Sequence, residues 1–158
     1  MNFVMRILVM AGVSLSAAAC QVSPVIGASA TSPAFSPLTI KSGKKVHKFK
    51  VEIVRTPEEQ ARGMMFRESL APDAGMIFPM APPRPASFWM KNTIIPLDII
   101  FIRADGSIAR IAAETIPYSL DPVTSGEPVA AVLEIAGGRA AQLGIAEDDI
   151  VIWADAAK

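Results

Sequence analysis

The sequence predicts a mainly-β fold, a compact sandwich or barrel with two short helices. Many short apolar segments are separated by residues that favour turns, which is typical of strands rather than of long helices. Only two segments carry the residues that begin and end a helix. With a single cysteine in the chain, no intramolecular disulfide can form. A hydrophobic core must therefore stabilise the domain.

The first 19 residues have the layout of an export signal. Arg6 is their only charged residue, and an apolar run and a set of small residues follow it. The apolar run is shorter than the roughly 20 residues that a membrane-spanning helix needs. We therefore expect residues 1–19 to be a signal peptide and the mature protein to be exported.

Cys20 follows three alanines, and this pattern resembles the lipid-attachment site of bacterial lipoproteins, although Ala17 stands where that site favours leucine. The alternative is ordinary cleavage after an Ala-x-Ala motif, without a lipid. Since a lone exported cysteine otherwise leaves a free thiol, we expect lipidation and a periplasmic protein anchored to the outer membrane. Residues 20–45, at first rich in Ser, Ala and Pro, would then form a flexible tether.

A single domain is predicted over residues 46–158. Its first strand alternates Phe49, Val51 and Ile53 with charged residues, which is the period of a half-buried strand. The lysines within residues 41–50 suit a solvated strand face, and contact with anionic lipid is the alternative.

A short helix is predicted next, from Thr56 to Gly63. Thr56 can cap the free amides, Glu59 can complete a capping box, and Gly63 can end the helix. A second short helix is predicted at residues 139–143, where a glycine stands on each side.

Apolar segments bounded by turn residues predict the remaining strands. They lie at residues 75–80, 86–90, 97–102, 107–113, 129–135 and 149–153. Because loops usually carry the binding and catalytic groups, residues 81–85 and 116–128 are the loops in which we expect function.

Four motifs together resemble a known family. They are GMMFRESL at residues 63–70, GMIF at 75–78, FWMKNTIIPLDIIFI at 88–102 and VLEIAGGRAAQLGI at 132–145. Residues 51–153 thereby resemble the domain of unknown function, family 192, with Met64 standing where the family usually has leucine. The resemblance implies a compact β-rich domain, often exported in bacteria, and it implies no activity.

Charge and residue supply exclude several function classes. Removing the signal leaves 14 basic against 15 acidic residues, which gives no reason to expect nucleic-acid binding. His47 is the only histidine and no Gly-x-Ser-x-Gly motif is present, so neither a Cys–His pair nor a serine hydrolase has its parts. We therefore expect no cofactor and a non-catalytic binding or accessory module of the cell envelope.

The partner of such a binding module would be a small ligand or another envelope protein. Asp98 and Glu134 each interrupt an apolar strand, and burying a carboxylate is costly unless it is paired or hydrogen-bonded. The two carboxylates could form internal ion pairs, clamp loop amides, or hold a ligand in a polar pocket. The candidate ligand-binding residues are Arg67, Trp89, Lys91, Asn92, Asp98 and Glu134.

Two other functions stay open. A hydrolase would use Asp98 and Glu134 as its acid and base. A Cu(I)-binding periplasmic protein would use thioethers, which are soft ligands, with Trp89 covering the ion. The candidate copper ligands are the methionines of the mature chain, Met64, Met65, Met76, Met80 and Met90.

Overall fold

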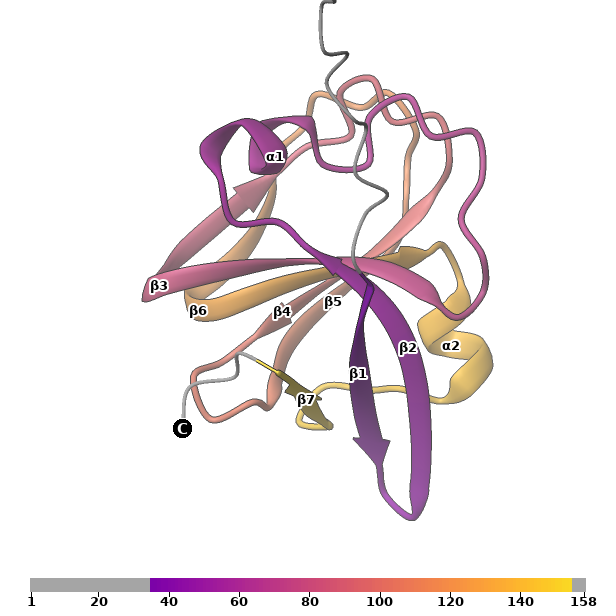
Figure 1. The fold of residues 1–158 in the computed structure, drawn as a ribbon, viewed down its shortest axis with the longest axis vertical. Coiled ribbons are helices and arrows are strands. Elements are labelled where there is room, and N and C mark those ends of the chain that lie inside the picture. The colour runs from indigo at the N-terminus through magenta and orange to yellow at the C-terminus, as the bar shows by residue number, and fades with distance from the viewer. Residues whose placement is uncertain (1–34, 155–158) are drawn as a thin grey trace, which may run out of the picture. The chain divides into compact units, whose positions relative to one another are not determined.

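The computed structural model describes residues 35–154, and a seven-stranded sheet dominates them (Figure 1). The strands are β1 (Phe35–Ser42), β2 (Lys45–Ile53), β3 (Ala74–Phe88), β4 (Leu97–Ile102), β5 (Ile108–Thr115), β6 (Val123–Ala136) and β7 (Ile150–Trp153). Two short helices, α1 (Pro57–Arg62) and α2 (Arg139–Leu143), complete the fold. The predicted mainly-β class with two short helices is confirmed, and the sheet is not closed into a barrel. The predicted signal peptide and Cys20 lie outside the described residues.

One strand pair decides where the covered face of the sheet lies. The strand order is β5-β4-β6-β3-β2-β1-β7, and within it β2 and β3 are parallel while the other neighbours are antiparallel. A parallel pair cannot be joined by a tight hairpin, so the chain needs a crossover connection. Residues 54–73, which include α1, form this crossover. The segment starts at the end of β2 and passes over one face of the sheet before β3 begins (Figure 1).

The core has two halves because alternate side chains of a strand point to opposite faces. On β4, Ile100 and Ile102 pack in the half that also contains Trp153 and the α2 residue Ala140. Phe101, between them, packs in the other half, with the side chains beneath the crossover. All six residues of β4 are buried, so the centre of the sheet is covered on both faces.

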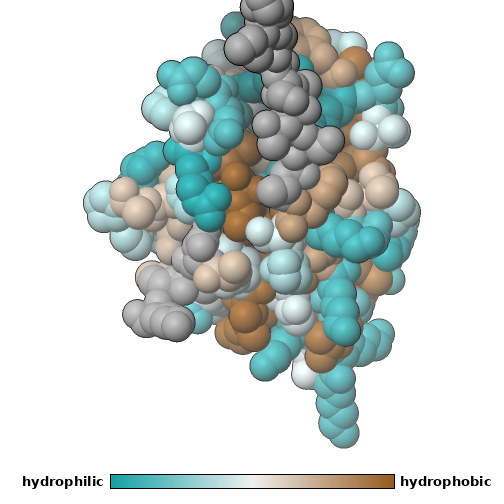
Figure 2. Space-filling model, in the orientation of Figure 1, coloured by the Kyte–Doolittle hydropathy of each residue, from teal (hydrophilic) through white to brown (hydrophobic). Residues whose placement is uncertain are grey.

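Large apolar side chains also remain at the surface. In Figure 2, brown atoms lie in small groups between teal ones on the face that is drawn. The most exposed large apolar residues are Ile116, Leu120 and Phe66, at 72%, 65% and 63%. None of the helices among residues 35–154 is long and apolar enough to cross a membrane.

Several helices and strands lie where the local sequence predicted them. The Thr56 hydroxyl accepts a hydrogen bond from the Glu59 amide at 3.2 Å, and the Glu59 carboxylate accepts one from the Thr56 amide at 3.1 Å. This is the predicted capping box at the start of α1. Strand β4 and helix α2 begin and end at the predicted residues.

The domain begins before residue 46, so the predicted tether is wrong for residues 35–45. Strand β1 lies in this segment and pairs with both β2 and β7. Its serine and proline favoured a linker, yet Pro37 is compatible with the strand. It lies outside the β7 pairing, so the amide that proline lacks is not needed there.

Of the two predicted loops, residues 81–85 belong to a strand and residues 116–128 form a loop only in their first part. Strand β3 runs through residues 81–85, with a register shift against β6 between Pro79 and Arg84. Strand β6 already begins at Val123, inside the predicted loop at 116–128. Proline-rich and glycine-containing segments favoured turns, whereas the sheet accommodates them through local irregularities in pairing.

Candidate ligand-binding site

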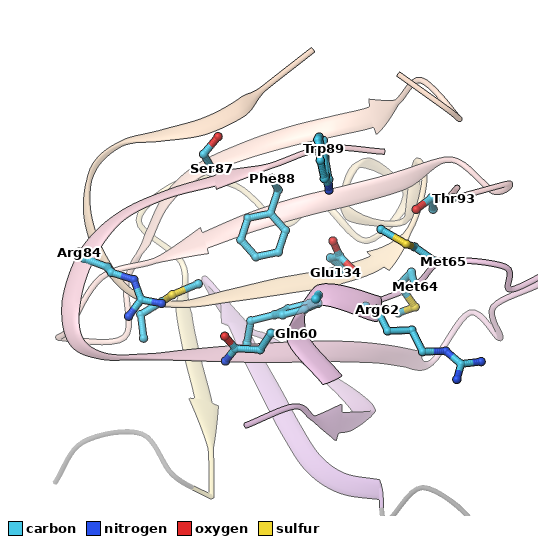
Figure 3. A pocket seen from close by; sticks show the side chains of 14 residues that line it. Gln60, Arg62, Met64, Met65, Arg84, Ser87, Phe88, Trp89, Thr93 and Glu134 are labelled. Atoms are coloured by element: carbon cyan, nitrogen blue, oxygen red, sulfur yellow. The ribbon is translucent and has the colours of Figure 1, made fainter. Parts of the chain in front are cut away.

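A pocket of about 310 Å³ lies on the sheet face that the crossover covers (Figure 3). The crossover contributes Gln60, Ala61, Arg62, Gly63, Met64 and Met65. Strands β3 and β6 and the segment after β3 contribute Phe78, Met80, Arg84, Ser87, Phe88, Trp89, Thr93 and Glu134. The pocket therefore has a floor made by the sheet and a wall made by α1 and the turn after it.

The crossover is fastened to the sheet by short-range contacts. The Gln60 side chain donates hydrogen bonds to the carbonyls of Val54 and Pro79, at 3.3 and 3.5 Å. At Gly63, where φ is +46°, an added Cβ would meet the Phe78 ring at 3.4 Å. Absence of a side chain at this position thus lets the end of α1 approach the floor closely.

Glu134 is the polar group in the floor. It lies on β6 between Met76 of β3 and Ile99 of β4, so its neighbours across the sheet are apolar. The residue is 5% exposed, and its buried Oε2 atom has no hydrogen-bond partner in the part of the chain that the structure describes. Burial raises the pKa of Glu134 to about 8, and the charge of Arg67 acts in the opposite direction. Figure 3 shows the carboxyl group between Phe88 and the pair Met64 and Met65.

Arg67 forms its ion pair with Glu52 and not with Glu134. Its two terminal nitrogens donate to the two oxygens of Glu52 at 2.6 and 2.7 Å, a bidentate pair at the edge of the same sheet face. The hydrogen bonds to Glu52 raise the pKa of Arg67. Since this guanidinium is engaged by Glu52, no side chain within residues 35–154 forms an ion pair with Glu134.

Asp98 lies on the opposite face of the sheet. Its neighbour on β6 is Ile135, whereas Glu134 is opposite Ile99, and adjacent residues of a strand point to opposite faces. Asp98 is fully buried, and its carboxylate accepts the backbone amides of Glu114, Gly138 and Ala140, each at 2.8 Å. Asp98 therefore clamps loop amides, as one of the two structural interpretations predicted.

This geometry removes the hydrolase alternative. A pair of catalytic carboxylates must face one cleft across the substrate. Asp98 and Glu134 are separated by the sheet itself, so they cannot act on the same bond. The interpretation failed because the alternation of each strand could be read from the sequence, but the register between strands could not.

The Lys91–Thr93 turn lies beside the pocket. The Lys91 Nζ atom lies 5.1 Å from the centre of the Trp89 ring, a cation–π contact. Asn92 has a positive φ of 54°, its carbonyl accepts the Phe66 amide at 2.9 Å, and its side chain contacts the sulfur of Met65. The turn thereby fixes one end of the crossover next to the pocket lining.

The methionines divide into two groups. Met64, Met65 and Met80 line the pocket, whereas Met76 and Met90 are buried in the core and do not line it. Among the described residues, no three His, Cys, Asp or Glu side chains form a group that could hold a metal ion. The pocket thus brings together three of the five predicted thioethers and one carboxyl.

Of the predicted ligand-binding residues, the structure brings Trp89 and Glu134 to the pocket and Lys91 and Asn92 to its border. Sequence reasoning missed the contributions of α1, Arg84 and Phe88. Helix α1 has the composition of an exposed helix, and none of its residues is buried. Only the parallel pairing of β2 and β3 turns this surface helix into a pocket wall.

The family model for DUF192, described as "Uncharacterized ACR", matches residues 38–153. The chain belongs to this family. The matched range contains every residue that lines the pocket, so the pocket is a feature of the DUF192 domain itself. It also contains the Asp98 clamp and both helices.

Two crystal structures are similar to this DUF192 chain. A protein of unknown function from Novosphingobium aromaticivorans DSM 12444 shares 45% identity with a TM-score of 0.75, covering 90% of this chain and all of the other. A candidate transcription regulator from Sinorhizobium meliloti 1021 shares 37% identity with a TM-score of 0.75, covering 78% of this chain and 96% of the other. The comparison with curated proteins gives no match.

Proposed function

We propose that this DUF192 protein is an exported, non-catalytic binding module of the cell envelope, whose small ligand occupies the pocket above Glu134. One observation carries the proposal: a buried carboxyl with an unpartnered oxygen forms part of the pocket floor. A buried polar group without a partner costs about 1–3 kcal/mol. A ligand that forms a hydrogen bond or ion pair with this oxygen would recover the cost of burying it.

The rest of the lining supports ligand binding. Ligand pockets are mainly apolar, with a few polar groups that orient the ligand, and volumes start near 300 Å³. Here phenylalanine, tryptophan and methionine side chains surround a single buried carboxyl. Methionine side chains adapt to irregular ligand shapes.

Export and anchoring belong to the same proposal. The support is the signal-like segment at residues 1–19 and the lipid-attachment pattern at Cys20. In cell fractionation, the protein is expected with the membranes, and Cys20→Ser is expected to move it to the soluble periplasmic fraction. Recovery of the unaltered protein in the cytoplasm would overturn this part.

The binding proposal is tested by thermal unfolding of the full-length protein with a panel of small cations, small anions, glycans, peptidoglycan fragments and metal ions. A ligand at 100 times its Kd adds about 2.7 kcal/mol to the unfolding free energy. We expect at least one class to raise Tm, and Met65→Trp, which places a larger side chain where Met65 already points into the pocket, to abolish the shift. Lys44→Trp, which adds the same ring in the exposed β1–β2 turn, should preserve it. If no class shifts Tm, or if Met65→Trp preserves every shift, the pocket is not a binding site.

Cu(I) is the second candidate. The observation in its favour is that Met64, Met65 and Met80 line one pocket together with Trp89. Thioethers select Cu(I) among biological metal ions. A Tm shift by Cu(I) under reducing conditions, lost in Met64→Leu and Met65→Leu, would support copper binding over a small organic ligand.

A further inference from the structure

We propose that the pocket selects a small organic cation, an alkylammonium group that pairs with the Glu134 carboxylate and lies against Phe88 and Trp89. The inference rests on the proposed function, since it assigns a ligand class to the same pocket. It follows from the balance of charges around the floor, from the aromatic lining, and from the contact that Lys91 already makes.

The charges on this face leave Glu134 uncompensated. Glu52, Met76 and Glu134 lie side by side on β2, β3 and β6. Arg67 uses both terminal nitrogens on Glu52, so this pair is neutral as a unit. Glu134 can become neutral in only two ways, by taking up a proton or by pairing with a cation from outside the fold.

The aromatic and thioether side chains of the pocket suit contact with an organic cation. The Phe88 ring is held edge-on to Phe78, with centroids 5.0 Å apart, and to Phe101, with centroids 6.5 Å apart. Trp89 is half exposed beside it. Aromatic faces attract ammonium groups, most strongly where water is excluded. The thioethers of Met64 and Met65 add polarisable surface for methyl and methylene groups.

Lys91 shows that this wall accepts the proposed chemistry. Its side chain is an alkylammonium group, and its Nζ atom lies 5.1 Å from the centre of the Trp89 ring. A ligand of the same class would meet both an aromatic ring and, unlike Lys91, a buried carboxylate. The fold therefore contains an internal example of the contact that we assign to the ligand.

Two arginines of the pocket lining restrict the charge that the distal end of the ligand can carry. Arg62 and Arg84 line the pocket from α1 and β3, and both are exposed. Figure 3 shows the Arg62 guanidinium directed away from Glu134, and Arg84 on the other side of Phe88. Charges in solvent are screened, so they do not prevent an ammonium group from reaching Glu134. They do favour a ligand whose distal end is neutral or anionic.

Binding of an ammonium group should release a proton. The buried carboxyl is mostly protonated near neutral pH, because burial raises its pKa to about 8. Pairing requires the carboxylate, so the Glu134 proton leaves to solvent while the ligand keeps its own charge. The other charged side chains around the pocket are Glu52 and Arg67, which pair with each other, and Arg62, Arg84 and the bordering Lys91. Affinity should therefore rise about tenfold per pH unit below pH 8.

The test is isothermal titration of the full-length protein at pH 6, 7 and 8. The probes are choline, its uncharged carbon isostere 3,3-dimethylbutan-1-ol, butylammonium and butyrate. We expect the two cations to bind at least tenfold more tightly than the isostere, with affinity rising with pH. About one proton should be released per cation at pH 6 and 7, and about half a proton at pH 8. The number of released protons is obtained from buffers with different ionisation enthalpies.

Single substitutions test whether the preference for cations and the proton release come from the pocket. Glu134→Gln should abolish the preference for the charged probes and the proton release, and Trp89→Ala should weaken binding of the cations more than of the isostere. Glu68→Gln, an exposed glutamate of the same crossover, should leave both unchanged. Proton release is measured on the unaltered protein, so the inference is tested even if Glu134→Gln fails to fold.

The possible outcomes separate the inference from the function on which it rests. Equal or tighter binding of the isostere or butyrate, blocked by Met65→Trp, would overturn the cation assignment and leave a ligand pocket. Binding of Cu(I) without either organic cation would also overturn it. No binding of any probe or panel compound would overturn both.

Discussion

Glu134 is a single residue with two opposing effects on the protein. Within the fold it costs stability, because an apolar setting disfavours the charged carboxylate and Oε2 has no partner among residues 35–154. For a ligand, the same features make it a strong and directional partner. A buried carboxyl with a strongly raised pKa is typical of functional sites.

The cost predicts a pH dependence of stability. The folded pKa of Glu134 is about 8, above the ordinary value of 4.5, so the folded state holds a proton that the unfolded state loses first. Its contribution to stability is fully present below about pH 4.5 and is lost as pH rises through 8. The unfolding free energy should fall by at most about 1.4 kcal/mol per pH unit in this window.

Urea unfolding between pH 5 and 8 measures this slope, and Glu134→Gln should flatten it. Glu59 and Asp105, whose pKa values are lowered by hydrogen bonds, act below this window. Glu68→Gln serves as the control and should keep the slope. Equal slopes in the unaltered protein and Glu134→Gln would show that the carboxyl is not buried in solution.

At the scale of elements, Asp98 joins three parts of the fold that are distant in sequence. From β4 it accepts amides at the end of β5 and at the start of α2. Because Gly138 and Ala140 are held in this way, α2 needs no side-chain cap of its own, and none is present. Helix α2 is thus fixed to the sheet face opposite the pocket.

Asp98→Asn should destabilise the domain strongly without altering the pocket directly. The amide removes the charge and turns one acceptor into a donor that faces backbone N–H groups. Hydrogen bonds to a charged group contribute about 1.5–3 kcal/mol each, so we expect a loss of about 3 kcal/mol or more. Chemical denaturation measures it, and the exposed Asp121→Asn should change stability by less than about 0.5 kcal/mol. A small loss in Asp98→Asn would mean that the three amides find other partners.

At the scale of the whole molecule, β1 is the first strand of residues 35–154 and lies beside the last, β7. It pairs with β2 on one side and β7 on the other, and it buries Leu38 and Ile40 completely. Burying one such side chain contributes about 1.5–3 kcal/mol. Without β1, β7 would have no neighbour in the strand order, and the edge of β2 would be open.

Two truncated chains test the position of the domain boundary. A chain that starts at Ser32 should unfold cooperatively with the full stability of the domain. One that starts at Val46 lacks β1 and should lose at least about 3 kcal/mol or fail to fold. Circular dichroism in urea compares them, and equal midpoints would show that β1 is dispensable.

Much of the local structure was predictable because its causes are local. The capping box at Thr56 and Glu59 and the two glycines around α2 identify both helices from neighbouring residues alone. The apolar run of β4 identifies a central strand. The prolines of β1 and β3 misled the prediction, because whether a missing amide matters depends on the neighbouring strand.

The sequence by itself determined the fold class, the family resemblance and the two polar interruptions at Asp98 and Glu134. Only the tertiary structure decided that these carboxylates lie on opposite faces, one as a clamp and one in a pocket. The physical reason is that the direction of a side chain alternates along its own strand, whereas register and strand order come from pairing between distant segments. The pocket exists because β2 and β3 are parallel, which carries α1 over Glu134.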